Sequence, residues 1–426
     1  MTTATLTGEI LVERMSAEER ERAALIESVL PALREHAVEV DRKGKFHLPH
    51  VKTLSEKGLL GLMVPKEYGG LGGGLRDLLA ATFAMGTACP STALTYFFQC
   101  SASSRGSLLL AALDEGLFNA EEAPKVKEWA ELLLNLIGRE GKWMGNFSSE
   151  NSKSENAKIT IETVAKKVDG GWLLNGVKSF ACAYGVADYY LVTASLEGAE
   201  DLNGLCTFIV DSKHEGCSPR INWDSLGMRG SETCGLVMKD VFVPEKFGLG
   251  IAGSFAKSMK MSRGSFVGNQ LAGAGVYVGV VHNVYSETIN MLKTKKFVDT
   301  GRPLGTGPMY QQLVGEMLTH YHTAVLWLRR QLELETANPS ILPKDEVIKL
   351  WRLCKGQVAE SGFNVAVLAL KATGTSGGLA NATTARALRE MAMGIVQAYP
   401  AERGRLDAAH TEIAGEAEAL FAPIKS

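Results

Sequence analysis

The 426 residues are enough for two or three domains, and 46% hydrophobic with 22% charged residues is typical of a globular protein. A net charge of −2 gives no field that would attract nucleic acid or an anionic membrane, and no apolar run reaches the roughly 18 residues of a membrane span. The seven cysteines form no C-x-x-C pair, and their odd number argues against a disulfide framework. We therefore expect a cytoplasmic protein with no nucleic-acid or membrane partner.

Residues 1–142 are predicted to form a helical domain. Ser16, followed by Glu18 and Glu19, is a typical helix start, and an apolar stripe at helical spacing follows it. The segment 64–74 (VPKEYGGLGGG) contains too much glycine and proline for a helix. Pro90 is predicted to end one helix or to begin the next.

Residues 143–252 are predicted to form a central β-domain, because the apolar spacing changes toward two. Strands are expected at Ile159 and Ile161 and over the ranges 172–175, 189–194, 206–210 and 235–243. Asp169-Gly170-Gly171 predicts a hairpin turn.

Residues 253–426 are predicted to form a helical bundle. Gly264, Gly268 and Ala272, four residues apart, indicate a helix over 264–279 with a small-residue face. Further helices are expected over 310–335, 345–373 and 383–398. The predicted class is α+β, with an N-terminal helical domain, a central β-barrel-like domain and a C-terminal four-helix bundle.

Several motifs resemble the acyl-CoA dehydrogenase flavoproteins, and the resemblance extends over about residues 20–420. The segments 226–244 (LGMRGSETCGLVMKDVFVP) and 172–178 (WLLNGVK) resemble that family's middle β-domain, and 64–70 (VPKEYGG) resembles its Pro-x-x-Tyr-Gly-Gly loop. The resemblance implies FAD as cofactor and redox chemistry on acyl thioesters of CoA or a carrier protein. It also implies a homo-oligomer, a tetramer or a dimer.

The same resemblance implies where flavin would be bound. Ser148-Ser149-Glu150 stands where the family has a Thr-Glu-Pro loop, and Phe180 and Cys182 stand where an aromatic ring packs on the isoalloxazine and a hydroxyl contacts N5. The alternative is that Phe180 and Cys182 are plain strand-core residues. The residues expected to bind the cofactor are Phe147, Ser148, Ser149, Phe180, Cys182, Lys371, Gly374 and Gly377.

Both positions at which the family keeps a catalytic glutamate hold another residue here. Counting on from Arg389-Glu390 places Ala398 at one position, and Ser262 stands at the other. A carboxylate general base contributes about 10²- to 10⁴-fold in rate, so its loss bears directly on activity. Glu402 is the nearest substitute in sequence; the alternative for Glu402 is a surface ion pair with a neighbouring arginine, Arg403 or Arg405. Substrate contacts are expected from Glu155, Arg263 and Tyr399.

Three functions remain open. The first is an FAD-dependent oxidoreductase for acyl thioesters, with an electron-transfer flavoprotein, oxygen or another acceptor. The second is a flavin-dependent monooxygenase, because 145–151 (GNFSSEN) resembles the dibenzothiophene monooxygenase branch. The third is a degenerate binding subunit without redox activity. We predict no metal site, since His320 and His322 point apart on their helix.

Overall fold

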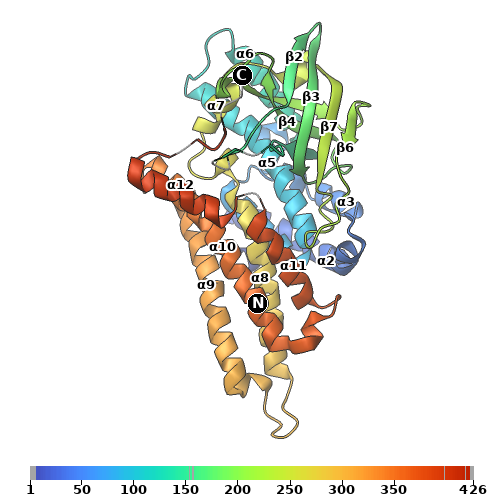
Figure 1. The fold of residues 1–426 in the computed structure, drawn as a ribbon, viewed down its shortest axis with the longest axis vertical. Coiled ribbons are helices and arrows are strands. Elements are labelled where there is room, and N and C mark those ends of the chain that lie inside the picture. The colour runs from blue at the N-terminus through green and yellow to red at the C-terminus, as the bar shows by residue number, and fades with distance from the viewer. Residues whose placement is uncertain (1–5, 153, 156–157, 398, 418, 423–426) are drawn as a thin grey trace.

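The computed structural model describes residues 6–152, 154–155, 158–397, 399–417 and 419–422. A curled sheet that is central in the sequence lies at one end of the molecule, and the C-terminal helices α8–α11 (residues 271–396) extend away from it (Figure 1). The predicted α+β class is confirmed. None of the helices in the described ranges is long and apolar enough to cross a membrane.

The N-terminal helices begin and end where the sequence supplies caps. At the start of α2, Ser16 Oγ accepts from the Glu19 N–H at 3.1 Å, and the Glu19 carboxylate accepts from the Ser16 N–H at 2.7 Å. Gly44 ends α2 with a left-handed φ of 62°, and Pro90 begins α5 as predicted. The helices are α1 (Leu6–Glu9), α2 (Ala17–Lys43), α3 (Pro49–Ser55), α4 (Leu75–Ala88), α5 (Pro90–Asp114) and α6 (Ala123–Gly138).

The sheet has the strand order β6-β7-β3-β2-β4-β5-β8, and β1 pairs parallel with β4. The predicted hairpin turn is confirmed: β2 and β3 are joined at Gly170, which has a φ of 72°. The strands are β1 (Met144–Phe147), β2 (Val164–Val168), β3 (Gly171–Ala181), β4 (Tyr189–Leu196), β5 (Leu205–Asp211), β6 (Cys217–Pro219), β7 (Cys234–Pro244) and β8 (Gly248–Leu249). All lie within 143–252; the two boundaries between the three predicted domains stay predictions.

The strand expected at Ile159 and Ile161 is wrong. Ile159 makes an isolated bridge with Phe421 near the end of the chain, and Ile161 packs with Phe255 and Phe421 in a small apolar cluster. The alternating isoleucines therefore serve tertiary packing rather than a sheet ladder.

The C-terminal bundle contains the predicted long helices, and α12, which was not predicted, crosses the N-terminal half of α10 (Figure 1). The helices predicted over 310–335, 345–373 and 383–398 are confirmed within a few residues at each described end. The helices are α7 (Ser254–Lys260), α8 (Leu271–Thr294), α9 (Pro308–Thr336), α10 (Lys344–Thr373), α11 (Thr383–Val396) and α12 (Ala401–Ala414).

The helix predicted over 264–279 is wrong in its first part, because α8 begins at Leu271. A 3-10 turn precedes it, and in that turn Val267 has a left-handed φ of 59°. This conformation interrupts a right-handed helix and is rare for a β-branched residue. Gly264 and Gly268 therefore lie in the loop before α8.

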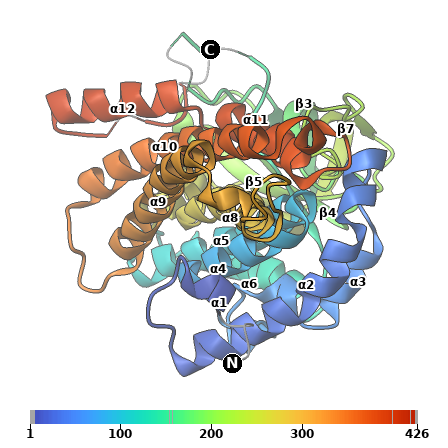
Figure 2. The ribbon, with the colours of Figure 1, turned by 90° about the horizontal axis from the view of Figure 1, so that it is seen from below.

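Glycines do allow close helix packing, but at a different place from the one predicted. A β-carbon at Gly279 of α8 would lie 2.3 Å from the carbonyl oxygen of Phe83, and one at Gly86 of α4 would lie 2.4 Å from that of Val276. Seen from below, α8 lies between α4 and the other bundle helices (Figure 2). This contact joins the N-terminal helices to the bundle.

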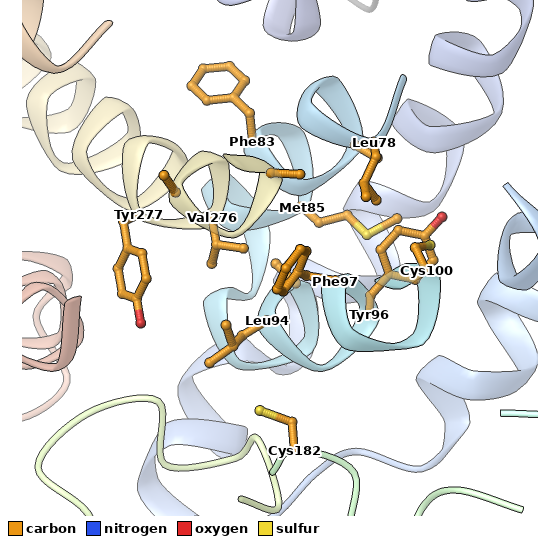
Figure 3. Packing of buried hydrophobic residues seen from close by; sticks show 14 of the residues in the cluster. Leu78, Phe83, Met85, Leu94, Tyr96, Phe97, Cys100, Cys182, Val276 and Tyr277 are labelled. Carbon is orange, nitrogen blue, oxygen red and sulfur yellow. The ribbon is translucent and has the colours of Figure 1, made fainter. Parts of the chain in front are cut away.

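Helix α5 is buried along most of its length between the sheet, α4 and α8. Figure 3 shows Leu94 and Phe97 of α5 beside Val276 of α8, with Cys182 from the sheet below them. The fold thus brings the ends of β1 and β3 against the middle helix of the molecule.

Candidate active site

The end of β1 lies beneath α5 and carries the residues expected to meet flavin. Ser148 Oγ accepts from Arg105 Nη2 at 3.1 Å and lies 3.0 Å from Thr193 Oγ1. The Ser149 carbonyl accepts from the Ser179 N–H at 2.9 Å. These contacts fix the half-buried Ser148-Ser149 segment between α5, β3 and β4.

A buried ion pair holds the next residue of the loop. Lys178 Nζ lies 2.6 Å from Glu150 Oε1, and the two side chains are 0% and 3% exposed. Lys178 also donates to the Ser148 carbonyl at 3.2 Å, and Glu150 accepts from the Thr163 backbone at 3.0 Å and hydroxyl at 2.6 Å. Burial lowers the pKa of Lys178, and the Glu150 carboxylate opposes that shift. The buried ion pair therefore fixes the conformation of the 148–150 loop.

Arg105 is a buried cation without a carboxylate partner among the described residues. Its Nε and Nη1 make no hydrogen bond there, and its guanidinium carbon lies 4.9 Å from the ring of Phe255 and 5.8 Å from that of Phe266. Burial lowers the pKa of Arg105 to about 10, so the group stays charged at neutral pH. An uncompensated buried charge is expensive, which points to a binding role for its free donors. The sequence signal was an arginine inside a run of small and apolar residues.

Phe180 is an exposed aromatic residue near the end of β3, an interior strand of the sheet. Its side chain is 46% exposed, the Trp223 ring lies 5.9 Å away edge-on, and the Arg220 guanidinium lies 5.4 Å from the Phe180 ring. Arg220 also donates to the Ser179 carbonyl at 3.3 Å. Phe180 and Trp223 thus form an open aromatic wall beside Ser149. Sequence analysis did not single out Arg220 or Trp223.

Cys182 points away from that wall. It is 1% exposed, and its sulfur lies 3.2 Å from Thr233 Oγ1. A register shift between Lys178 and Ala181 breaks the alternation of β3, which explains why Phe180 and Cys182 do not share a surface. Burial raises the pKa of Cys182 to about 12, so the thiol is neutral. A flavin contact of Cys182 stays a prediction.

A cleft of about 510 Å³ opens between the 64–74 loop, α5 and the turn before α8. Leu108 of α5 and the strained Val267 line it. A β-carbon at Gly268, also in the lining, would lie 3.8 Å from Ser262 Oγ, which is buried and makes no hydrogen bond among the described residues. Ser262 therefore lies beside the cleft-lining Gly268, but it is not itself one of the lining residues. The lining residues are Met63, Pro65, Lys66, Glu67, Gly72, Gly73, Ser104, Ser107, Leu108, Val267 and Gly268.

Arg263, expected to contact substrate, turns toward the bundle. Its guanidinium donates to the Ala337 carbonyl and to Ser340 Oγ in the loop between α9 and α10. Glu155, the other charged residue placed near the substrate, is exposed in a turn. Their substrate contacts stay predictions.

The loop between α11 and α12 holds the other substituted base position. Ala398 lies outside the described residues, and Gln397 before it accepts from the Tyr277 hydroxyl. Tyr399 is buried, donates to Asp407 and has its ring 5.3 Å from that of Trp351. A substrate contact of Tyr399 stays a prediction.

Glu402 is exposed in the first turn of α12. The arginines weighed as its partners pair elsewhere: Arg403 Nε lies 2.8 Å from Asp407, and Arg405 pairs with Glu360. Glu402 therefore stays only a predicted ion-pair partner, since both arginines pair with other carboxylates among the described residues. Its catalytic role stays a prediction.

The predicted dinucleotide turn lies at the end of α10, away from the sheet (Figure 1). Lys371 is exposed, Gly374 has a φ of 63°, and a β-carbon at Gly374 or Gly378 would meet nothing within 4 Å. Gly377 is buried and would clash with Thr373 if substituted. The open face of this turn is available to another molecule.

Comparisons with known proteins agree on the family. The N-terminal domain of acyl-CoA dehydrogenases matches residues 17–114, and the middle domain matches residues 146–241. The mitochondrial isovaleryl-CoA dehydrogenase of Arabidopsis thaliana is 26% identical over 83% of this chain and 81% of its own. The chain belongs to the acyl-CoA dehydrogenase superfamily.

Solved structures share the fold. KijD3, in complex with FMN and a dTDP-amino-keto sugar, has a TM-score of 0.77 at 24% identity and covers 96% of both chains. Butyryl-CoA dehydrogenase from Megasphaera elsdenii has a TM-score of 0.75 at 18% identity, covering 94% of this chain and 100% of its own. At such identities the likeness defines the fold and leaves the substrate open.

Proposed function

We propose that the protein is a flavin-dependent oxidoreductase, with FAD as cofactor, acting on an acyl thioester of CoA or a carrier protein. The observation that carries the proposal is Arg105 of α5, a buried cation beside the end of β1 whose Nε and Nη1 donate to no described residue. Such a donor set stabilises negative charge on a cofactor or substrate in a site shielded from water. The named activity of the Arabidopsis relative supports the thioester.

The residues present fit a flavin. The open wall of Phe180 and Trp223 offers packing for a planar ring, and the half-buried Ser148-Ser149 segment offers backbone and hydroxyl groups beside it. When bound, the flavin would supply the group that accepts hydride or activates oxygen. Arg105 would donate to an anionic atom of cofactor or substrate, and Lys178–Glu150 would hold the loop in place.

A flavin-dependent monooxygenase is the second candidate. It is favoured by Ser262, which lies beside the cleft-lining Gly268 and offers no carboxylate, and by Ala398 at the other family position. Oxygen activation by reduced flavin needs no base for an α-proton. A non-redox binding subunit would follow if the protein bound no flavin.

Two measurements test these proposals in order. The absorbance spectrum of the purified protein, followed by titration with FAD and FMN, tests the cofactor; a colourless protein that binds neither flavin contradicts both redox proposals. Anaerobic titration of the flavin-loaded protein with isovaleryl-, butyryl- and octanoyl-CoA then tests desaturation. Bleaching by a thioester supports the first candidate; oxygen consumption that begins only after chemical reduction of flavin supports the second.

We expect simple saturated acyl-CoAs to be poor substrates, because positions 398 and 262 lack the base. If one of them is oxidised briskly, another residue is the base. Comparing Glu402→Gln with Glu67→Gln then tells whether that base lies on α12 or in the cleft, because Glu67 is the carboxylate in the cleft lining. Ala398→Glu should raise desaturation if the pocket is otherwise complete.

The proposed assembly is a homo-oligomer, a tetramer or a dimer, in which the open turn at Gly374 meets a second copy. Light scattering that gives a stable monomer of 45.8 kDa would contradict it. We place the protein in the cytoplasm, which is supported by its seven free cysteines.

A further inference from the structure

Three histidines gather where α2 ends and α3 begins. His36 lies on α2, His47 in the connecting loop and His50 on α3. The ligand atoms of the three side chains all lie within 4.8 Å of one another. The rings of His36 and His47 stack with centroids 3.9 Å apart, and the His47 and His50 rings are 4.7 Å apart.

Hydrogen bonds orient two of these rings. His36 Nδ1 lies 3.2 Å from the Ala32 carbonyl, so it carries the proton and leaves Nε2 as an acceptor. His50 Nδ1 lies 2.9 Å from Thr92 Oγ1 of α5. Hydrogen bonding of the second ring nitrogen is the usual way in which a metal-binding imidazole is oriented.

The other nitrogen of His50 is unused. His50 is 1% exposed, and its Nε2 makes no hydrogen bond to any described residue. The Ala32 carbonyl, which is also the partner of His36 Nδ1, acts on this ring and opposes the lowering of its pKa. A buried polar atom without a partner needs an explanation, and a bound ion is one.

The surrounding charges suit a cation. Burial, reinforced by the other two histidines, lowers the pKa of His50 to about 4, and burial also lowers the pKa of His47. Both rings are therefore neutral at pH 7, as metal ligands must be. Glu39 and Glu35 of α2 face the cluster, and Lys43, paired with Glu39 at 2.5 Å, is the opposing charge.

We propose that His36, His47 and His50 bind a divalent transition-metal ion of the zinc class, with the fourth position open to water. Three imidazole nitrogens suit zinc and its neighbours far better than magnesium or calcium. In a tetrahedral site with Zn–N of about 2.1 Å the nitrogens are about 3.4 Å apart, so the two half-buried rings rotate toward the fixed Nε2 of His50. The ion joins α2 to α3 and, through Thr92, to α5.

The test uses the full-length protein after treatment with EDTA and removal of the chelator. Isothermal titration with Zn²⁺ should show one equivalent bound, and Co²⁺ should give visible bands of nitrogen and oxygen ligation without thiolate charge transfer. His36→Gln and His47→Gln should each weaken Zn²⁺ binding at least tenfold. His322→Gln, an exposed histidine of α9, is the matched control and should bind like the unaltered protein.

The proposal is overturned if the unaltered protein binds no Zn²⁺, if both cluster variants bind as tightly as the control, or if cobalt shows thiolate ligation. X-ray absorption of the zinc-loaded unaltered protein gives a readout that needs no variant. Three imidazole nitrogens in its spectrum support the site, and a shell containing sulfur or only oxygen contradicts it.

Discussion

Gly227 lies against the backbone of Arg389: a β-carbon added to Gly227 would come within 2.2 Å of the Arg389 carbonyl oxygen. Next to this contact, the Met228 N–H donates to Glu390, whose side chain is 1% exposed. The Gly-Met-Arg turn that carries the family resemblance is therefore the docking point between the sheet and α11. It offers a physical reason for glycine there, independent of the reaction.

Gly227→Ala should destabilise the protein by about 1–3 kcal/mol. The added methyl group would clash with the backbone of Arg389 and Glu390, which cannot move aside as a side chain could. Urea unfolding of the flavin-free protein measures this. Gly315→Ala is the control, since Gly315 is exposed within α9 and a β-carbon there meets nothing within 4 Å. That substitution should stabilise by about 0.5–1 kcal/mol. Equal effects of the two changes would show that Gly227 has room.

Local signals predicted much of the fold. The capping box at Ser16, the start of α5 at Pro90 and the turn at Gly170 each depend on residues close in sequence, and each is found. The failures have a common cause: Val267 and the bridge from Ile159 to Phe421 depend on contacts distant in sequence, which periodicity does not encode.

The site was less predictable than the fold. The family resemblance located Ser148 and Phe180, whose surroundings the structure describes. It gave no reason to select Arg105, because the absence of a partner is visible only once the neighbours are placed. For Cys182 the sequence supplied a position along β3, but not the bulge that turns its side chain inward.

Lys178→Met should cost about 3–5 kcal/mol, because it leaves Glu150 charged and buried without its cation. Urea unfolding provides the value. Lys166→Met removes the partner of Glu197 in an exposed pair with an N–O distance of 3.6 Å, and it should change stability by less than about 1 kcal/mol. A loss at Lys178 no larger than at Lys166 would mean that Glu150 takes up a proton or reaches water in the variant.

Glu390 should make stability depend on pH. Burial raises the pKa of its carboxyl from 4.5 to about 7. The folded state therefore holds a proton that the unfolded state has released, so this contribution is complete below about pH 4.5 and is lost as pH rises through about 7. His50, whose pKa is lowered to about 4, has the opposite slope below its unfolded value of 6.5.

The difference in stability between Glu390→Gln and the unaltered protein isolates the contribution of Glu390, because His50 titrates in both. Glu390→Gln keeps an acceptor for the Met228 N–H and removes the titration, so the stability gap between variant and unaltered protein should change with pH between about 4.5 and 7. Urea unfolding at several pH values measures the gap. A gap for Glu390→Gln that stays constant over this range would place the titration elsewhere.

Arg105→Met should weaken the binding of flavin or of an anionic substrate without lowering the stability of the flavin-free protein. Methionine fills similar space without a charge, and no described carboxylate is left stranded by the change, so the flavin-free protein should be as stable as before or more stable. Flavin affinity, or the affinity for an anionic substrate, should fall at least tenfold, as expected when charge-assisted donors are lost. Fluorescence titration and urea unfolding give the two values.

Arg22→Met is the matched control for this prediction. Arg22 is also buried, but its Nε lies 2.7 Å from Asp77, so its removal strands a carboxylate and should cost about 3–5 kcal/mol while leaving flavin affinity unchanged. The opposite pattern at Arg105, with stability lost and flavin bound as tightly as before, would make Arg105 a structural residue. Arg105 Nε and Nη1 donate to no described residue. We therefore expect the free-energy cost of burying this charge to be offset only when an anion binds next to it.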